Sequence, residues 1–219
     1  MPTITLRHSM LKRIQEINGA IHNKNDLSDL LPKMGCPVEL NDDDGIEIEV
    51  FPDRPDLLSH ETMARAVRSF QGDDTGRSSI EVSDSGITIS VDGDLEGVRP
   101  IIMGAVVRGV NTGNSAAERD SFIQSLMDHQ EKLHMTLGRK RSLASIGVHD
   151  LSKLKRPFRY EAVSGDFSFE PLASKDVMSI SEILDSHPKG IEYSKLMDGL
   201  DTYPIILDSN NEVVSFPPI

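Results

Sequence analysis

Residues 45–72 have the sequence GIEIEVFPDRPDLLSHETMARAVRSFQG, and their pattern predicts the fold class of the N-terminal part of the chain. Aliphatic side chains alternate with glutamates over residues 46–50, which predicts a strand over 46–51 that is buried on one face. Apolar residues then recur at helical spacing between Ser59, a favourable N-cap, and Gly72, which ends the helix. Thr62 stands where a capping box has glutamate, so we expect an incomplete box. A strand followed at once by a helix predicts a mixed α/β unit.

The same kinds of pattern extend over the rest of the chain. Strands are predicted at residues 3–6, 38–40, 87–91, 143–148 and 158–163, a fully buried strand at 100–110, and a hairpin at 203–208 and 212–216. Helices are predicted at residues 9–17, 27–31, 117–137, 180–184 and 193–197. The polar stretch 72–86 predicts a boundary between a small α/β domain (1–80) and a second domain (85–219). The fold class is therefore α+β, with mixed sheets.

Composition excludes several classes of protein. The chain has 219 residues and a formal net charge of −12. No apolar run approaches the roughly 20 residues that span a bilayer. Cys36 is the single cysteine, so an internal disulfide is impossible, and an inert buried thiol in a reducing, cytoplasmic setting is expected. The overall acidity argues against unspecific binding of nucleic acid.

Basic residues nevertheless concentrate between Lys132 and Arg159. This stretch contains eight basic residues and one acid, Asp150, which gives a net charge of +7 and leaves −19 on the remainder. A local basic surface can face a polyanion although the whole chain is acidic. Alternatively, the cations at 139–141 stabilise the negative end of a helix that Gly138 terminates. Charge alone leaves both interpretations open.

Motifs for common catalytic chemistries are missing. The sequence has no phosphate-binding glycine loop, no GxSxG and no HExxH. His129 and His134 are five residues apart and would diverge on a helix, so a metal pair is not expected. The acidic run 42–44 lacks the spaced ligands of a calcium loop, which favours a solvated turn.

Three segments have more specific chemistry. PDRPDLLS (52–59) combines two prolines with an Asp-Arg pair ahead of a capped helix, which predicts an ion pair of Arg54 with a carboxylate. The second segment is the basic stretch between Lys132 and Arg159, in which polar side chains stand at the ends of predicted helices and strands. The apolar hairpin 203–218 presents one serine hydroxyl beside aromatic side chains, a composition typical of a pocket wall.

Taken in this order, the segments resemble the N-terminal part of the β subunit of phenylalanyl-tRNA synthetase, of the archaeal and eukaryotic type. The resemblance covers nearly the whole chain. It rests on PDRPDLLS (52–59), ARAVRSFQG (64–72), RPIIMGAVVRGV (99–110), QEKLH (130–134), GRKR (138–141), SIGVHDL (145–151), FEPL (169–172), EILDSHPKG (182–190), YPIILD (203–208) and SFPPI (215–219).

The resemblance implies a subunit of an aminoacyl-tRNA synthetase. In that family the β subunit pairs with a catalytic α subunit in an (αβ)₂ tetramer, and the α subunit binds ATP and Mg²⁺ and charges tRNA(Phe). The β subunit contains an editing domain that hydrolyses mischarged Tyr-tRNA(Phe). Residues 85–219 would be the first part of that domain, and the chain would continue past Ile219. We therefore expect no cofactor in this part, and neither aminoacylation nor robust editing from it alone.

Site residues follow from the motif positions. The resemblance implies that Ile206 contacts the ring of the amino acid and that the Ser215 hydroxyl hydrogen-bonds to it. His149 and Asp150 would order the pocket or contact the terminal adenosine. The residues expected to contact the tRNA backbone are Arg139, Lys140, Arg141, Lys155 and Arg156. The alternative function is a non-catalytic module that shares the fold and binds RNA or a protein.

Overall fold

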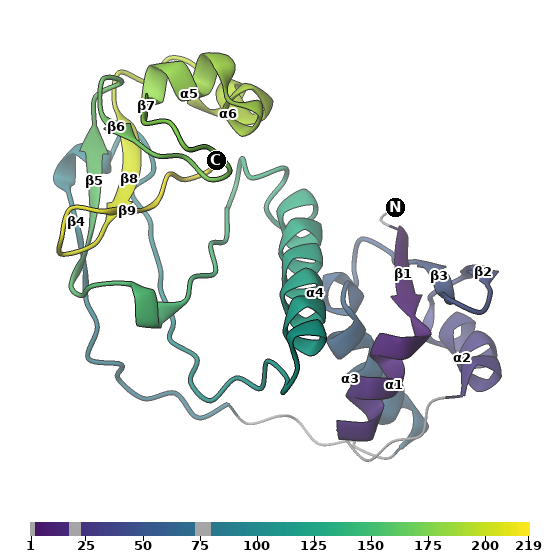
Figure 1. The fold of residues 1–219 in the computed structure, drawn as a ribbon. Helices are drawn as coiled ribbons and strands as arrows, with labels where there is room; N and C mark the ends of the chain where they lie inside the picture. Colours follow the sequence, from purple (N-terminus) through teal and green to yellow (C-terminus); the bar gives the residue numbers. More distant parts are fainter. Residues whose placement is uncertain (1–2, 18–22, 73–79) are drawn as a thin grey trace. The chain divides into compact units, whose positions relative to one another are not determined.

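The structure, a computed structural model, describes residues 3–17, 23–72 and 80–219, and it confirms a fold of mixed helices and sheets (Figure 1). The chain forms two compact units. The first unit comprises Met1–Glu81 and Gly109–Ala144, and the second comprises Val82–Arg108 and Ser145–Ile219. The division predicted at residues 80–85 differs from this one for residues 109–144, because it assigns them to the second domain.

A three-stranded antiparallel sheet forms the centre of the first unit, in the order β1-β3-β2. Ile4 lies opposite Ile48 and Leu6 lies opposite Ile46, so the aliphatic side chains of β1 and β3 share the buried face. The strands and helices of Met1–Glu81 are β1 (Thr3–Arg7), α1 (His8–Ile17), α2 (Lys24–Leu30), the 3₁₀ turn Leu31–Met34, β2 (Val38–Asn41), β3 (Gly45–Glu49), the 3₁₀ turn Pro55–Leu57 and α3 (His60–Gln71). Helix α1 begins at His8, one residue before the predicted cap Ser9.

The connection from β3 to α3 contains the predicted ion pair. Arg54 Nη2 lies 2.8 Å from Asp56 Oδ2, and the same pair raises the pKa of Arg54 and lowers that of Asp56. The expectation of an incomplete capping box is wrong. The Thr62 hydroxyl accepts a hydrogen bond from the Ser59 N–H while the Ser59 hydroxyl accepts one from the Thr62 N–H, because a threonine oxygen can replace the glutamate carboxylate at this position.

Helix α4 (Ala116–Met135) belongs to the first unit because its polar side chains bond to that unit. The Ser125 hydroxyl, which is buried, donates to both carboxylate oxygens of Glu61 at 3.0 Å. Lys132 Nζ donates to the backbone oxygen of Thr3 at 3.0 Å. A full capping box of Ser115 and Glu118 begins the helix, and the helix predicted over 117–137 is confirmed.

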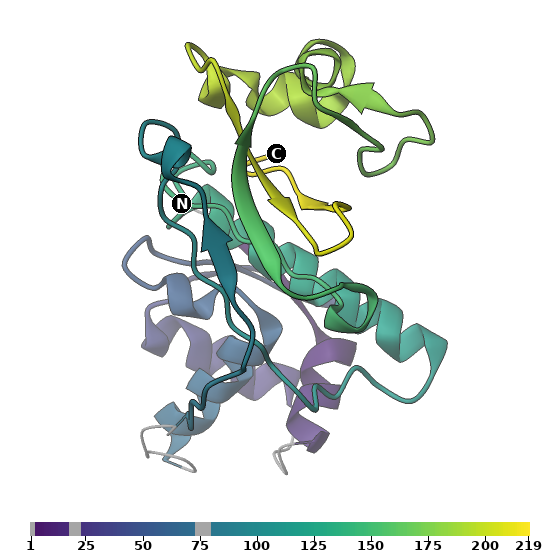
Figure 2. The same cartoon turned by 90° about the vertical axis from the view of Figure 1, so that its left-hand side faces the viewer.

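A four-stranded sheet in the order β4-β5-β8-β9 organises the second unit. Strand β4 pairs with β5 in parallel, and the other two pairs are antiparallel. Strands β5, β8 and β9 lie side by side in both views (Figures 1 and 2). The elements of this unit are β4 (Ile89–Val91), the 3₁₀ turns Gly93–Leu95, Leu151–Lys153 and Ser194–Met197, β5 (Phe158–Val163), β6 (Ser168–Phe169), β7 (Met178–Ser179), α5 (Ile180–Ser186), α6 (Pro188–Tyr193), β8 (Tyr203–Leu207) and β9 (Val213–Ser215).

The second unit has its own hydrophobic core. Ile180 and Ile183 of α5 pack there with Met197 and Phe216. The Phe216 ring meets the rings of Phe169 and Tyr203 edge to face, with centroids 6.0 and 6.4 Å apart. Phe216 of the SFPPI segment is therefore packed into the core of the unit.

Two predicted strands are wrong. Residues 100–110 and 143–148 belong to none of the sheets that the structure describes. In the first segment Ile101, Met103 and Val107 are 81%, 90% and 77% exposed, although a fully buried strand was expected. Apolar composition favours a buried strand only where a neighbouring strand can pair with it, and the described residues provide none for these segments.

Candidate functional site

One face of the four-stranded sheet brings together two residues predicted to form a pocket. Ile206 in β8 lies directly opposite Ser215 in β9, and on its other side it lies opposite Tyr160 in β5. Val91 in β4 is opposite Tyr160 in turn. Residues opposite one another in a sheet point to the same face, so these four side chains form a row across all four strands.

The two predicted pocket residues in this row are accessible to a ligand. Ile206 and Ser215 are half-buried, whereas the neighbouring Ile205 and Leu207 are buried on the opposite face. The Ser215 hydroxyl forms no hydrogen bond within the described residues, so it can donate to or accept from a ligand. An aliphatic side chain beside a free hydroxyl can bind a ring that has a polar substituent.

Tyr160 is the buried member of the row. Burial raises the pKa of its phenol, and the nearby positive charge of Arg99 opposes that increase. Burial also lowers the pKa of the Arg99 guanidinium, and the interaction with Tyr160 opposes this effect. The row therefore has a half-buried cation beside it, which the sequence analysis did not single out.

Asp208 fixes the turn between β8 and β9, and sequence reasoning missed it. The carboxylate is 1% exposed and accepts hydrogen bonds from three backbone N–H groups, those of Lys155 (3.2 Å), Asn210 (2.8 Å) and Glu212 (3.1 Å). Burial would raise the pKa of Asp208, but these hydrogen bonds outweigh it and lower the pKa. The signal in the sequence is an aspartate directly before Ser-Asn-Asn, the pattern of a side chain that caps a turn.

His149 and Asp150 lie outside the row. Asp150 caps the 3₁₀ turn Leu151–Lys153, because its carboxylate accepts hydrogen bonds from both the N–H and the hydroxyl of Ser152. These bonds lower the pKa of Asp150, and burial lowers that of His149. Among the described residues no hydrogen bond connects either residue to Ile206 or Ser215, so their role in a pocket stays a prediction.

The basic turn, residues Arg139–Arg141, follows α4 in the first unit. All three residues have left-handed backbones, with φ of +48° at Arg139, +55° at Lys140 and +64° at Arg141. Hydrogen bonds from Leu143 N to Gly138 O (3.0 Å) and from the Ser142 hydroxyl to Arg139 O (2.6 Å) close the turn.

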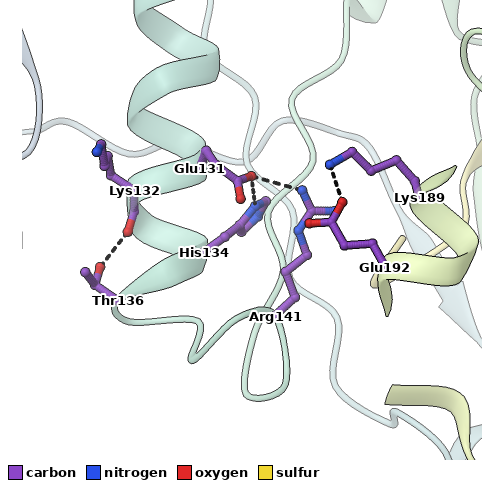
Figure 3. Close-up of polar contacts among 7 residues, drawn as sticks. All are labelled: Glu131, Lys132, His134, Thr136, Arg141, Lys189 and Glu192. Carbon is purple, nitrogen blue, oxygen red and sulfur yellow. Dashed lines mark hydrogen bonds and ion pairs between the residues drawn. The ribbon is translucent and has the colours of Figure 1, made fainter. Parts of the chain in front are cut away.

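Arg141 is bound to α4, as Figure 3 shows. Its Nη2 lies 3.1 Å from Glu131 Oε2, and the same oxygen is 3.4 Å from Nδ1 of His134, which is 2% exposed. Burial would raise the pKa of Glu131, but the bond with Arg141 and the nearby His134 lower it. The predicted cation Arg141 thus has a structural partner that charge counting could not reveal.

The other predicted cations are in the second unit. Lys155 and Arg156 are exposed, and the Lys155 backbone holds Asp208 and accepts from the Ser209 N–H at 3.0 Å. The basic stretch is therefore divided between the two compact units.

Cys36 is buried, as predicted, and burial raises the pKa of its thiol. In the described parts of the chain, no three His, Cys, Asp or Glu side chains are grouped as metal ligands would be. No helix among these residues is long and apolar enough to cross a membrane.

Comparison with known proteins identifies relatives over the entire chain. Phenylalanine–tRNA ligase beta subunits match all 219 residues in Methanococcoides burtonii (42% identity), and the same holds in Archaeoglobus fulgidus (44%) and Methanosarcina barkeri (45%). A crystal structure of an N-terminal fragment of the phenylalanyl-tRNA synthetase beta subunit from Pyrococcus horikoshii matches with a TM-score of 0.84 and 29% identity, and covers 100% of this chain. No protein-family model matches.

The chain is a relative of the phenylalanine–tRNA ligase beta subunits. These relatives are subunits of an aminoacyl-tRNA synthetase, and the resemblance seen in the sequence motifs is confirmed. The chain spans 38% of the length of these three beta subunits, and 62% of the solved Pyrococcus horikoshii fragment.

Proposed function

We propose that this chain acts as the N-terminal part of the β subunit of a phenylalanine–tRNA ligase and contributes to hydrolytic editing of Tyr-tRNA(Phe). Its partners would be a catalytic α subunit, in an (αβ)₂ tetramer, and tRNA(Phe). ATP and Mg²⁺ would be bound by the α subunit, which would perform the charging reaction. The relatives named above support the subunit assignment, because they match the chain from end to end.

The observation that supports the editing function best is the row across the second sheet. Tyrosine differs from phenylalanine by one hydroxyl, and a site that hydrogen-bonds to that hydroxyl can discriminate strongly between them. Ser215 offers a hydroxyl without a hydrogen-bond partner among the described residues, directly opposite the aliphatic Ile206. In the proposal Ile206 contacts the ring and Ser215 bonds to the phenol.

Ester hydrolysis makes further demands on the site. A water must be oriented towards the ester carbonyl, and donors must stabilise the oxyanion that develops. No covalent nucleophile is required. Ile206 and Ser215 bind and orient the amino acid in this scheme and do not provide the donors for the oxyanion, so we expect this chain alone to lack robust editing activity. Rapid hydrolysis of Tyr-tRNA(Phe) by this chain would contradict that expectation.

The editing proposal is tested with the complete ligase that contains the substitution Ser215→Ala. We expect hydrolysis of Tyr-tRNA(Phe) to slow by roughly twofold to twelvefold, the value of one hydrogen bond of about 0.5–1.5 kcal/mol, while charging with phenylalanine is unchanged. Ser209→Ala is the matched control, because Ser209 is an exposed serine in the turn after β8. Equal hydrolysis rates in the two variants would rule out the assigned role of Ser215.

The alternative function is a non-catalytic RNA-binding module. This alternative is favoured by the basic turn at Arg139–Arg141, because exposed cations can contact an RNA without a binding pocket. The two functions differ in outcome, because a pure RNA-binding module would hold tRNA equally well with either serine substitution and would leave editing rates unchanged in the complete ligase.

A further inference from the structure

The basic turn has an unfavourable backbone conformation at three consecutive residues. A left-handed backbone is unfavourable for a non-glycine residue, and here three such residues are adjacent. All three are also cations, whose mutual repulsion adds to the cost. Glycine or asparagine would adopt these angles more easily, so backbone geometry does not explain why the positions are basic.

Contacts with α4 hold the turn in this conformation. Arg141 bonds to Glu131, and the Arg141 N–H donates to the backbone oxygen of His134 at 3.4 Å. At Gly138 a side chain would overlap the backbone oxygens of His134 and Ala144, so only glycine permits the close return of the chain. The turn is therefore fixed by its own unit before any ligand arrives.

Arg139 and Lys140 differ from Arg141 in their surroundings. Both are exposed, and neither side chain forms an ion pair or a hydrogen bond within the described residues. A fixed backbone thus presents two adjacent cations to solvent, while the third cation contributes to fixing it. Such an arrangement suits neighbouring phosphates, which need closely spaced positive charges.

We propose that Arg139 and Lys140 bind backbone phosphates of an RNA and that Arg141 is a positioning residue that acts through Glu131. The proposal rests on the proposed function above, in which tRNA is the partner, and it revises the expectation that Arg141 itself contacts the RNA. Phosphate contacts fix the register of an RNA and make its binding dependent on salt.

The first test compares tRNA(Phe) binding by the full chain with and without the double substitution Arg139→Asn and Lys140→Asn. Asparagine tolerates the left-handed backbone, so we expect thermal stability to be retained or increased. Because two phosphate contacts are lost, the slope of log K against log salt should become shallower by about 1.5 to 2. The control is Lys175→Asn with Lys195→Asn, which removes the same charge from two exposed lysines of the second unit.

The outcomes separate the interpretations. An equal change of slope in both double variants would overturn the proposal, because it would show an effect of net charge alone. A loss of thermal stability with unchanged binding would also overturn it, and would favour stabilisation of the end of α4 by these cations. If the unsubstituted chain does not bind tRNA(Phe), the RNA contact of the proposed function fails together with this inference.

Arg141→Asn tests the positioning role. We expect weaker tRNA binding with an unchanged salt slope, because the variant loses the ion pair with Glu131 and no phosphate contact. Arg141→Lys, which can restore the ion pair, should recover part of the affinity. A slope that becomes shallower by about 1 in Arg141→Asn would make Arg141 a direct contact and contradict the positioning role.

Discussion

Asp208 shows how one buried carboxylate organises the turn beside the candidate pocket. Its oxygens accept hydrogen bonds from the N–H groups of Lys155, Asn210 and Glu212, and so they connect the segment before β5 to the turn after β8. The same hairpin places Ile206 opposite Ser215. The carboxylate is thus part of what fixes the geometry of the row.

Asp208→Asn should destabilise the second unit at neutral pH, because an amide cannot accept the same charge-assisted hydrogen bonds. The pKa of Asp208 is lowered in the folded protein. Its contribution to stability is therefore complete above the unfolded value of about 3.9 and is lost as the pH falls through the folded value. Chemical unfolding at several pH values measures how this contribution to the free energy of unfolding depends on pH.

In those measurements, the free energies of unfolding of the variant and the unsubstituted protein should converge below about pH 4, where the carboxylate becomes protonated. Asp201→Asn is the control, because Asp201 is exposed and has no hydrogen bond among the described residues. A constant difference down to acidic pH would contradict the role given to the charged form of Asp208.

At the scale of elements, the close contact of α5 and α6 depends on Gly190. A Cβ at this position would overlap the backbone oxygen of Ile183, and it would also press against Cα of Leu184. Backbone atoms of a helix cannot rotate away as a side chain can, so α6 would have to move. Ile183 is in the core of the second unit, which would be disturbed as well.

Gly190→Ala should therefore lower the free energy of unfolding by about 1–3 kcal/mol, the usual cost of overpacking. The sign is informative, because glycine to alanine within a helix otherwise stabilises by about 1 kcal/mol. Gly97→Ala serves as control, since a Cβ there meets nothing within 4 Å. Denaturant unfolding checks both variants, and a stabilised Gly190→Ala protein would refute the close approach.

At the scale of the whole molecule, the chain contains two separate hydrophobic cores, one in each compact unit. Ile48 is buried in the first core and Ile183 in the second. Replacing either by alanine should cost about 2–5 kcal/mol in its own unit. We expect calorimetry to resolve two transitions, of which each variant lowers a different one. If both substitutions shift one common transition equally, the two units unfold together.

The sequence alone was sufficient for features that depend on neighbouring residues. Patterns within a few residues predicted the strand over 46–51, the capped helix after Ser59, helix α4 and the hairpin at 203–216, because spacing, caps and turns act over short distances along the chain. The resemblance carried by the motifs was confirmed because ordered motifs identify relatives without knowledge of burial.

Features that depend on residues far apart in the sequence became visible only in the folded structure. The segment 100–110 has the composition of a buried strand yet pairs with none in the described chain, since composition does not determine whether a partner strand is present. Likewise, residues 109–144 join the first unit through the bond of Ser125 to Glu61, 64 positions earlier. Charge counting treated Arg139, Lys140 and Arg141 alike, and the ion pair of Arg141 with Glu131 separates them because it requires the chain to turn back onto α4.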